Sequence, residues 1–113
     1  QKMLSRISKA FKKQQIQAEI FKEHKKDCKY PIIICGDMNN SAYSYVYRDI
    51  RGDLKDSFEE AGLGFGKTYK FRYYPARIDY IFADASMTVK KLETFSDFEN
   101  SDHYPIMAQF SMN

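Results

Sequence analysis

Three short segments of this sequence place acids, an amide and a histidine within expected strands or where such strands meet loops. They are Gly36 to Asn39, Arg77 to Ile81, and Ser101 to Pro105. Carboxylates at such positions can hold a hard divalent cation or accept a proton, and a protonated imidazole can donate to an anion. Asp79 is the most demanding of these groups, because a carboxylate inside an apolar strand is costly unless it is paired or hydrogen-bonded.

Each segment also has a purely structural interpretation. Asp37 and Asn39 are residue types that commonly cap turns. Asp79 could form a structural ion pair with Arg72 or Arg77.

The third segment leaves similar alternatives open. Ser101 and Asp102 could cap a helix or a turn, and His103 could be a core histidine with satisfied hydrogen bonds. His24, the other histidine, lies among lysines in a helical pattern and is expected at the surface. No single segment therefore decides the function.

The elements that must position these residues begin with an amphipathic helix. Apolar residues recur at helical spacing from Met3 to Cys28, and Pro31 ends this pattern. The β-branched run from Ile32 to Cys35 predicts a strand that is buried on both faces, with Cys35 as a small buried residue. Asp37 then begins a loop at the carboxyl end of a central strand, where open α/β sheets place their chemistry.

The remaining pattern predicts two short helices and several strands. Helices are expected at Tyr43 to Ile50 and at Leu54 to Ala61, followed by a glycine-rich loop from Gly62 to Gly66. The expected strands are Thr68 to Phe71, Arg77 to Phe82, Val89 to Phe95, and Tyr104 to Phe110. This order predicts an α/β layered fold with a mixed sheet covered by the N-terminal helix.

Composition limits the class of protein but not its substrate. With 113 residues, 43% of them apolar, the chain can form one small domain with a core, and a net charge of +3 does not by itself indicate nucleic-acid binding. Cys28 and Cys35 have neither disulfide nor zinc-site spacing. The sequence has no signal peptide and no apolar run long enough to span a membrane. Because it starts at Gln1 inside a helical pattern, we expect an N-terminal truncation and assign no compartment.

Taken together, the three segments resemble the signature of the endonuclease/exonuclease/phosphatase family. The resemblance rests on Gly-Asp-x-Asn after a β-branched strand, Arg-Ile-Asp-Tyr-Ile about forty residues later, and Ser-Asp-His-x-Pro before the last strand, and it covers Pro31 to Phe110. It implies a metal-dependent phosphoesterase, acting as a nuclease or a phosphatase. It also implies that residues 1–113 are the C-terminal portion of one domain, half of a four-layered, deoxyribonuclease-like α/β sandwich.

The resemblance also implies a role for each matched residue. Asp37 would activate or position the attacking water, and Asn39 would hydrogen-bond the phosphate. His103 would donate to a phosphoryl oxygen, with Asp79 orienting its ring and raising its pKa. Asp102 would lie beside the metal, Mg²⁺ or Mn²⁺.

The substrate remains undetermined at this point. The aromatic and basic loop from Phe71 to Pro75 suggests Tyr74 and Arg77, besides Asn39, as substrate-binding residues, although this loop could equally pack on the sheet. Nucleic acid, phosphoinositide, sphingomyelin and sugar phosphate are all compatible with the motifs.

Parts of the family pattern are absent from the sequence. The family's principal metal-binding Glu, an Asn and a second His belong to segments that would precede Gln1. We therefore expect this chain to be inactive alone and to associate as a homo-oligomer or with the missing N-terminal half of the domain. The alternative function is a non-catalytic binding module that retains the fold.

Overall fold

The computed structural model describes residues 16–38, 45–71, 75–97 and 100–112. The named elements are β1 (Ile33–Asp37), α2 (Tyr45–Arg51), β2 (Lys55–Asp56), α3 (Ser57–Ala61), β3 (Asp79–Ala83), β4 (Met87–Thr94) and β5 (Ile106–Met112). A further helix covers residues 16–26. The α/β class that the sequence predicts is confirmed.

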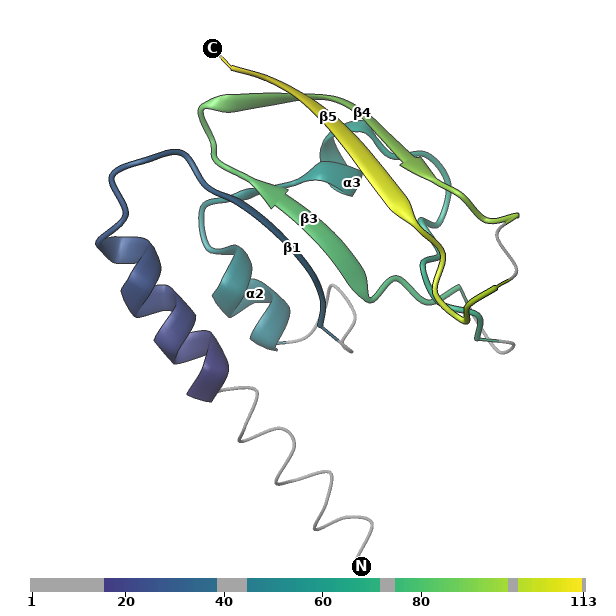
Figure 1. The fold of residues 1–113 in the computed structure, drawn as a ribbon, viewed down its shortest axis with the longest axis horizontal. Coiled ribbons are helices and arrows are strands. Elements are labelled where there is room, and N and C mark those ends of the chain that lie inside the picture. Colours follow the sequence, from purple (N-terminus) through teal and green to yellow (C-terminus); the bar gives the residue numbers. More distant parts are fainter. Residues whose placement is uncertain (1–15, 39–44, 72–74, 98–99, 113) are drawn as a thin grey trace, which may run out of the picture.

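The strands form two sheets (Figure 1). The first has the order β1-β3-β2, and the second consists of β4 and β5. Where the sequence suggested a mixed sheet, each pairing of the described strands is antiparallel. The helix α3 contacts both β3 and β4 and thereby links the two sheets.

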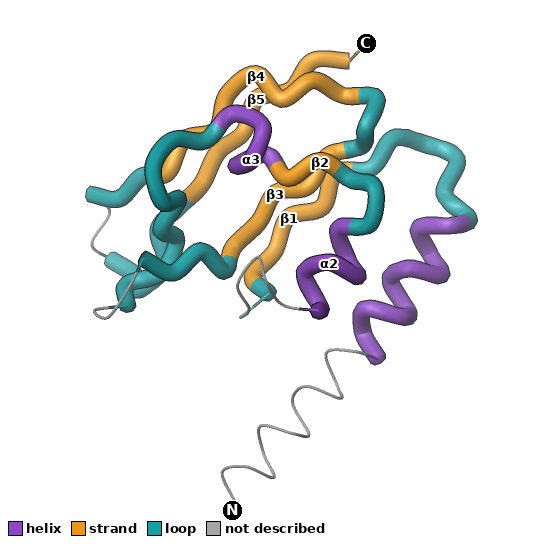
Figure 2. Tube along the Cα trace, turned by 180° about the vertical axis from the view of Figure 1, so that it is seen from behind, coloured by secondary structure: helices purple, strands orange, loops and turns teal. Residues whose placement is uncertain are grey.

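Two helices lie side by side next to the first sheet in both ribbon views (Figures 1 and 2). They are the helix at 16–26 and α2, and Lys22 of the first lies 3.7 Å from the carboxylate of Asp49 in the second. Ala18 of the first helix is fully buried. The first half of the predicted helix, from Met3 to residue 15, lies outside the described residues. None of the described helices is long and apolar enough to cross a membrane.

The core lies between α2 and the first sheet. Its buried residues are Tyr47, Leu54, Tyr80 and Phe82, and the rings of Tyr47 and Tyr80 have centroids 4.9 Å apart. The Tyr47 hydroxyl donates to Asp56 at 2.6 Å. Burial, with this bond, raises the pKa of Tyr47 to about 12, so the phenol stays protonated and can act as the donor.

Asp56 is a buried acid with three hydrogen-bond donors. Its side chain is 1% exposed and accepts from Tyr47, from Arg77 at 2.8 Å and from the N–H of Phe58. The last bond caps α3, which explains why the helix begins at Ser57. The predicted helix from Leu54 therefore starts three residues later, since Lys55 and Asp56 pair with β3 instead.

The glycine-rich loop after α3 wraps around one aromatic ring. A side chain at Gly62 or Gly66 would lie within 2.5 Å of the Phe58 ring, and Gly66 also has a φ of +67°. The Arg77 guanidinium lies 4.7 Å from the centroid of the same ring. Glycine is thus required here by both close approach and backbone conformation, as the predicted loop anticipates.

Two predictions about the strands are wrong. β1 is not buried on both faces, because Ile33 is 45% exposed and Cys35 is also exposed. The apolar run is therefore uncovered on one side in this chain. The segment from Thr68 to Phe71 forms no strand; Tyr69 makes isolated bridges to Ala76 and His103.

Candidate active site

Two carboxylate residues lie opposite each other on neighbouring strands of the first sheet. Asp37 is the last residue of β1, and its register partner is Asp79, the first residue of β3. The antiparallel pairing of these strands brings together acids that are far apart in the sequence. Like charges directly opposite one another destabilise a strand pair. This arrangement therefore requires a neighbouring cation.

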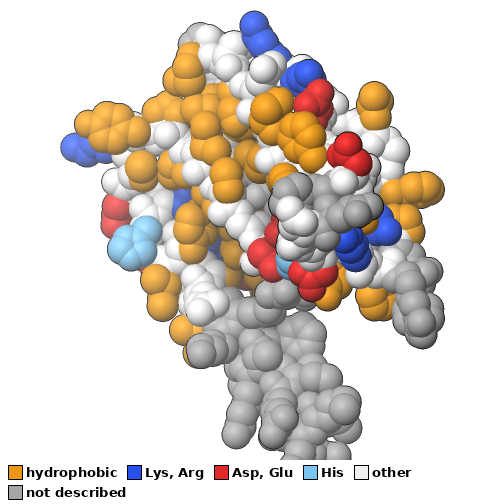
Figure 3. Space-filling model, turned by 45° about the vertical axis from the view of Figure 1, so that its right-hand side comes forward, with side chains coloured by type: hydrophobic (Ala, Val, Ile, Leu, Met, Phe, Trp, Pro, Cys, Tyr) orange, Lys and Arg blue, Asp and Glu red, His pale blue; other side chains and the backbone are white. Residues whose placement is uncertain are grey.

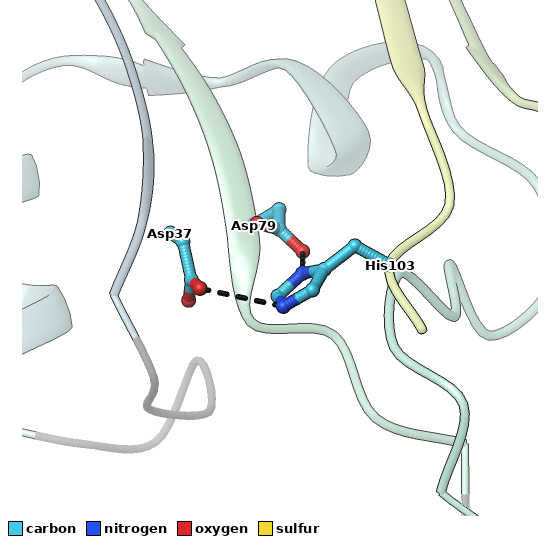
Figure 4. A group of neighbouring side chains, drawn as sticks. All are labelled: Asp37, Asp79 and His103. Carbon is cyan, nitrogen blue, oxygen red and sulfur yellow. Dashed lines mark hydrogen bonds and ion pairs between the residues drawn. The ribbon is translucent and has the colours of Figure 1, made fainter. Parts of the chain in front are cut away.

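His103 lies between the two acids (Figure 4). Its Nδ1 is 2.8 Å from Asp79 Oδ2, and its Nε2 is 3.5 Å from Asp37 Oδ2. The contact predicted between Asp79 and His103 is thus present. A ring with an acceptor at each nitrogen is best matched by the imidazolium form, because both nitrogens are then donors. The histidine therefore supplies the charge that the acid pair requires.

The neighbouring acids raise the pKa of His103. The hydrogen bond to Asp79 contributes most, and the charges of Asp79, Asp37 and Asp102 act in the same direction. Desolvation opposes them but is smaller than the hydrogen bond to Asp79. A larger fraction of His103 is consequently protonated at neutral pH than of an ordinary histidine.

Short-range contacts fix the backbone and ring of His103. The Ser101 hydroxyl accepts the N–H of His103 at 3.1 Å, which confirms that Ser101 stabilises a turn. The Tyr69 ring lies 5.0 Å from the imidazole ring, centroid to centroid. The sequence did not single out Tyr69, because an aromatic residue in an expected strand carries no signal of a site.

Arg77 forms its ion pair with an acid other than Asp79. It pairs with buried Asp56 and its guanidinium also lies 4.9 Å from the centroid of the Tyr80 ring. This resolves the alternative in which Arg77 neutralises Asp79. It also gives Arg77 a structural contact where the sequence suggested substrate binding, with 13% of its side chain exposed.

The other predicted site residues are distributed as follows. Asp102 precedes His103 and is exposed, but it does not belong to the group of potential ligand atoms within 4.8 Å formed by Asp37, Asp79 and His103. His24 is exposed on the first helix, as expected. Asn39, Tyr74 and Arg72 lie outside the described residues.

Comparison with known proteins places this geometry in a family. The sequence pattern described as Endonuclease/Exonuclease/phosphatase family matches residues 8–103. The chain belongs to this family. The matched range contains the first two segments in full and the third as far as His103. No curated protein matches the chain significantly.

Several solved structures share part of this fold. The mannosyl-6-phosphatase Bt3783 of Bacteroides thetaiotaomicron VPI-5482 is 24% identical with a TM-score of 0.64, over 88% of this chain and 44% of that one. A family protein from Bacteroides vulgatus gives 24% and 0.73, with the same coverage. A protein of unknown function from Enterococcus faecalis V583 gives 25% and 0.69, over 83% and 42%. The chain thus has part of this α/β fold and spans less than half the length of each matched structure.

The charge on His103 is open to direct measurement. We expect an NMR titration to give His103 a pKa above 6.5, and Asp79→Asn to lower it, since the strongest hydrogen bond to the charged form is then weakened. The pair's contribution to folding stability is complete below the unfolded value and is lost as pH rises through the higher folded value. A His103 pKa that is equal in the wild type and in Asp79→Asn would contradict this assignment.

Proposed function

We propose that this chain forms the catalytic part of a metal-dependent phosphoesterase that hydrolyses a phosphodiester or phosphomonoester. The observation that carries the proposal is the His103 ring lying between Asp79 and Asp37 at adjoining strand ends. An ion-pair network alone does not establish catalysis. Here it coincides with family membership and with a histidine that is 33% exposed and can therefore reach a bound substrate.

Each of the three side chains has a distinct proposed task. Asp79 holds the Nδ1–H of His103 and so fixes the direction of the opposite ring nitrogen. The Nε2–H then donates to a phosphoryl oxygen as negative charge develops there, a contribution typically worth ~3–4 kcal/mol. Asp37 positions the attacking water and accepts its proton as the water oxygen bonds to phosphorus, while the bond from phosphorus to the ester oxygen breaks and the alcohol leaves, taking its proton from solvent. Asn39 is proposed to hydrogen-bond the phosphate.

The donor chemistry fits a hard divalent cation, Mg²⁺ or Mn²⁺. Such ions prefer carboxylate oxygens, of which Asp37, Asp79 and Asp102 supply several within this part of the chain. Because Asp37 and Asp79 both contact His103, we propose Asp102 as the metal ligand of this chain, completed by a Glu from the rest of the domain. When bound, the cation neutralises charge on the phosphoryl group.

The alternative is a binding module that keeps the fold without turnover. This chain spans less than half the length of the matched structures. The remaining metal ligands and a second His would belong to the rest of the domain, so the chain alone could bind without turnover. Catalysis and binding are separated by turnover itself. A phosphate ester that binds without being hydrolysed would support the alternative.

The substrate class is best approached with a panel of esters. Bt3783 is described as a mannosyl-6-phosphatase, so a sugar 6-phosphate belongs in the panel. A short DNA duplex, an abasic-site duplex, a phosphoinositide and sphingomyelin represent the other classes compatible with the motifs. Hydrolysis of one of these in the presence of Mg²⁺ would identify the class.

Loss of either central group should abolish most of the activity. In the full-length protein that contains this chain, we expect Asp37→Ala and His103→Ala each to lower kcat at least about 100-fold. His24→Ala, at an exposed helical position, serves as the matched control and should leave kcat within about twofold. The 113-residue chain alone should not turn over. Robust Mg²⁺-dependent hydrolysis by that chain would contradict our account of which groups are missing.

We also propose that this chain, on its own, associates through its uncovered apolar surface. Apolar side chains cover much of the face shown in Figure 3. β1 exposes Ile33 and Cys35, and β5 ends in Met112, which is 64% exposed. Monomers rarely expose a large contiguous apolar patch. A second copy, or in the longer protein the rest of the domain, is the proposed partner.

Sedimentation equilibrium at micromolar concentration tests the association. We expect a mass at least twice 13.3 kDa for the chain, and a shift toward monomer for Ile33→Ser, which removes apolar area from the exposed face of β1. Leu63→Ser is the control, because Leu63 is 93% exposed but lies in the loop after α3. A monomer of 13.3 kDa in the wild type would disprove this proposal.

A further inference from the structure

We propose that Thr68 is a positioning residue that holds Asp79 and His103 in register with each other. Thr68 is 2% exposed although its side chain is polar. Its hydroxyl oxygen accepts the N–H of Ile78 at 3.0 Å and the N–H of Asp79 at 3.1 Å. A hydroxyl has two acceptor lone pairs, so one side chain satisfies both backbone groups at the start of β3.

The two hydrogen bonds to the Thr68 hydroxyl lie at the end of β3 where β2 does not pair with it. β2 pairs with β3 only at Phe82 and Ala83, at the opposite end of the strand from Asp79. The half-buried N–H groups at the Asp79 end require other acceptors. The Thr68 hydroxyl supplies one and thereby fixes the backbone from which the Asp79 carboxylate projects.

The same residue also holds the segment that carries His103. The Thr68 carbonyl accepts the N–H of Tyr104, the residue after His103, at 2.8 Å. Two residues further on, the N–H of Lys70 donates to the carbonyl of Asp102 at 2.7 Å. The segment around Thr68 is therefore bonded to the chain on both sides of His103.

Thr68 consequently connects two groups that are 24 residues apart in sequence and 2.8 Å apart in space. Its hydroxyl accepts the N–H of Asp79, and its carbonyl accepts the N–H of Tyr104, the residue after His103. The strength of the contact between Nδ1 and the Asp79 carboxylate depends steeply on this alignment. Thr68 touches neither the ring nor the carboxylate in this scheme, so it acts on the reaction through them.

Comparison of Thr68→Val with Thr68→Ser tests the inference. Valine keeps the shape but removes the acceptor, whereas serine keeps the acceptor. In the full-length protein we expect Thr68→Val to lower kcat about 10- to 100-fold with KM changed less than about threefold, since a displacement near 1 Å can cost that much. Thr68→Ser should keep kcat within about threefold.

A spectroscopic measurement separates positioning from general destabilisation. We expect the Nδ1–H proton of His103 to give a downfield NMR resonance in the wild type and in Thr68→Ser, and to move upfield or broaden in Thr68→Val. A Thr68→Val protein that is less stable but keeps both the resonance and kcat would overturn the inference. The kinetic arm rests on the proposed function, but the NMR arm does not, so an inactive wild type would leave the NMR result decisive.

Hydrogen exchange keeps the test valid if Thr68→Val does not fold. In the folded wild type we expect the amides of Ile78 and Asp79 to be protected to a degree similar to those in the middle of β3. Exchange of both amides at the rate of exposed loop amides would overturn the inference without any substitution.

Discussion

The site depends on one electrostatic constraint, the opposition of two acids in neighbouring antiparallel strands. The register of β1 and β3 places Asp37 directly across from Asp79. Two carboxylates at such a position repel each other, and the pair is tolerable when a cation lies between them. His103 is placed to provide that charge, and its hydrogen bond to Asp79, together with its attraction to the neighbouring acids, raises its pKa. The acids and the histidine are therefore one electrostatic unit.

A second ion pair makes this unit possible. Arg77 lies two residues before Asp79 and would be a natural partner for it. Instead, fully buried Asp56 binds the guanidinium at 2.8 Å, and the rings of Phe58 and Tyr80 pack against it. Because Arg77 is already paired with Asp56, the Asp79 carboxylate is available to His103. The core of the domain thus helps to determine which positively charged side chain the Asp79 carboxylate contacts.

The sequence predicts which residues form the site better than it predicts the burial and hydrogen bonds around them. The contact of Asp79 with His103 was implied by the family resemblance; the carboxylate in an apolar strand required a partner but did not identify it. The burial of Ile33 and Cys35 was predicted wrongly, because an apolar run reports what a strand can pack against, and in this chain one face of β1 is uncovered. Asp56 was missed, although the acid three residues before Glu59 is a capping signal at a helix start. Thr68 was not recognised because its hydrogen bonds are formed by tertiary contacts, for which residue spacing gives no signal.

Whether Asp79 and His103 act as a unit is tested most directly by a double-mutant cycle on kcat. The variants are Asp79→Asn, His103→Ala and their combination, in the full-length protein with its substrate and Mg²⁺. If Asp79 acts through the imidazole, the combined variant should have the same kcat as His103→Ala alone, within about threefold. Multiplication of the two single effects in the combined variant would show that the acid and the histidine act independently, and would contradict this account.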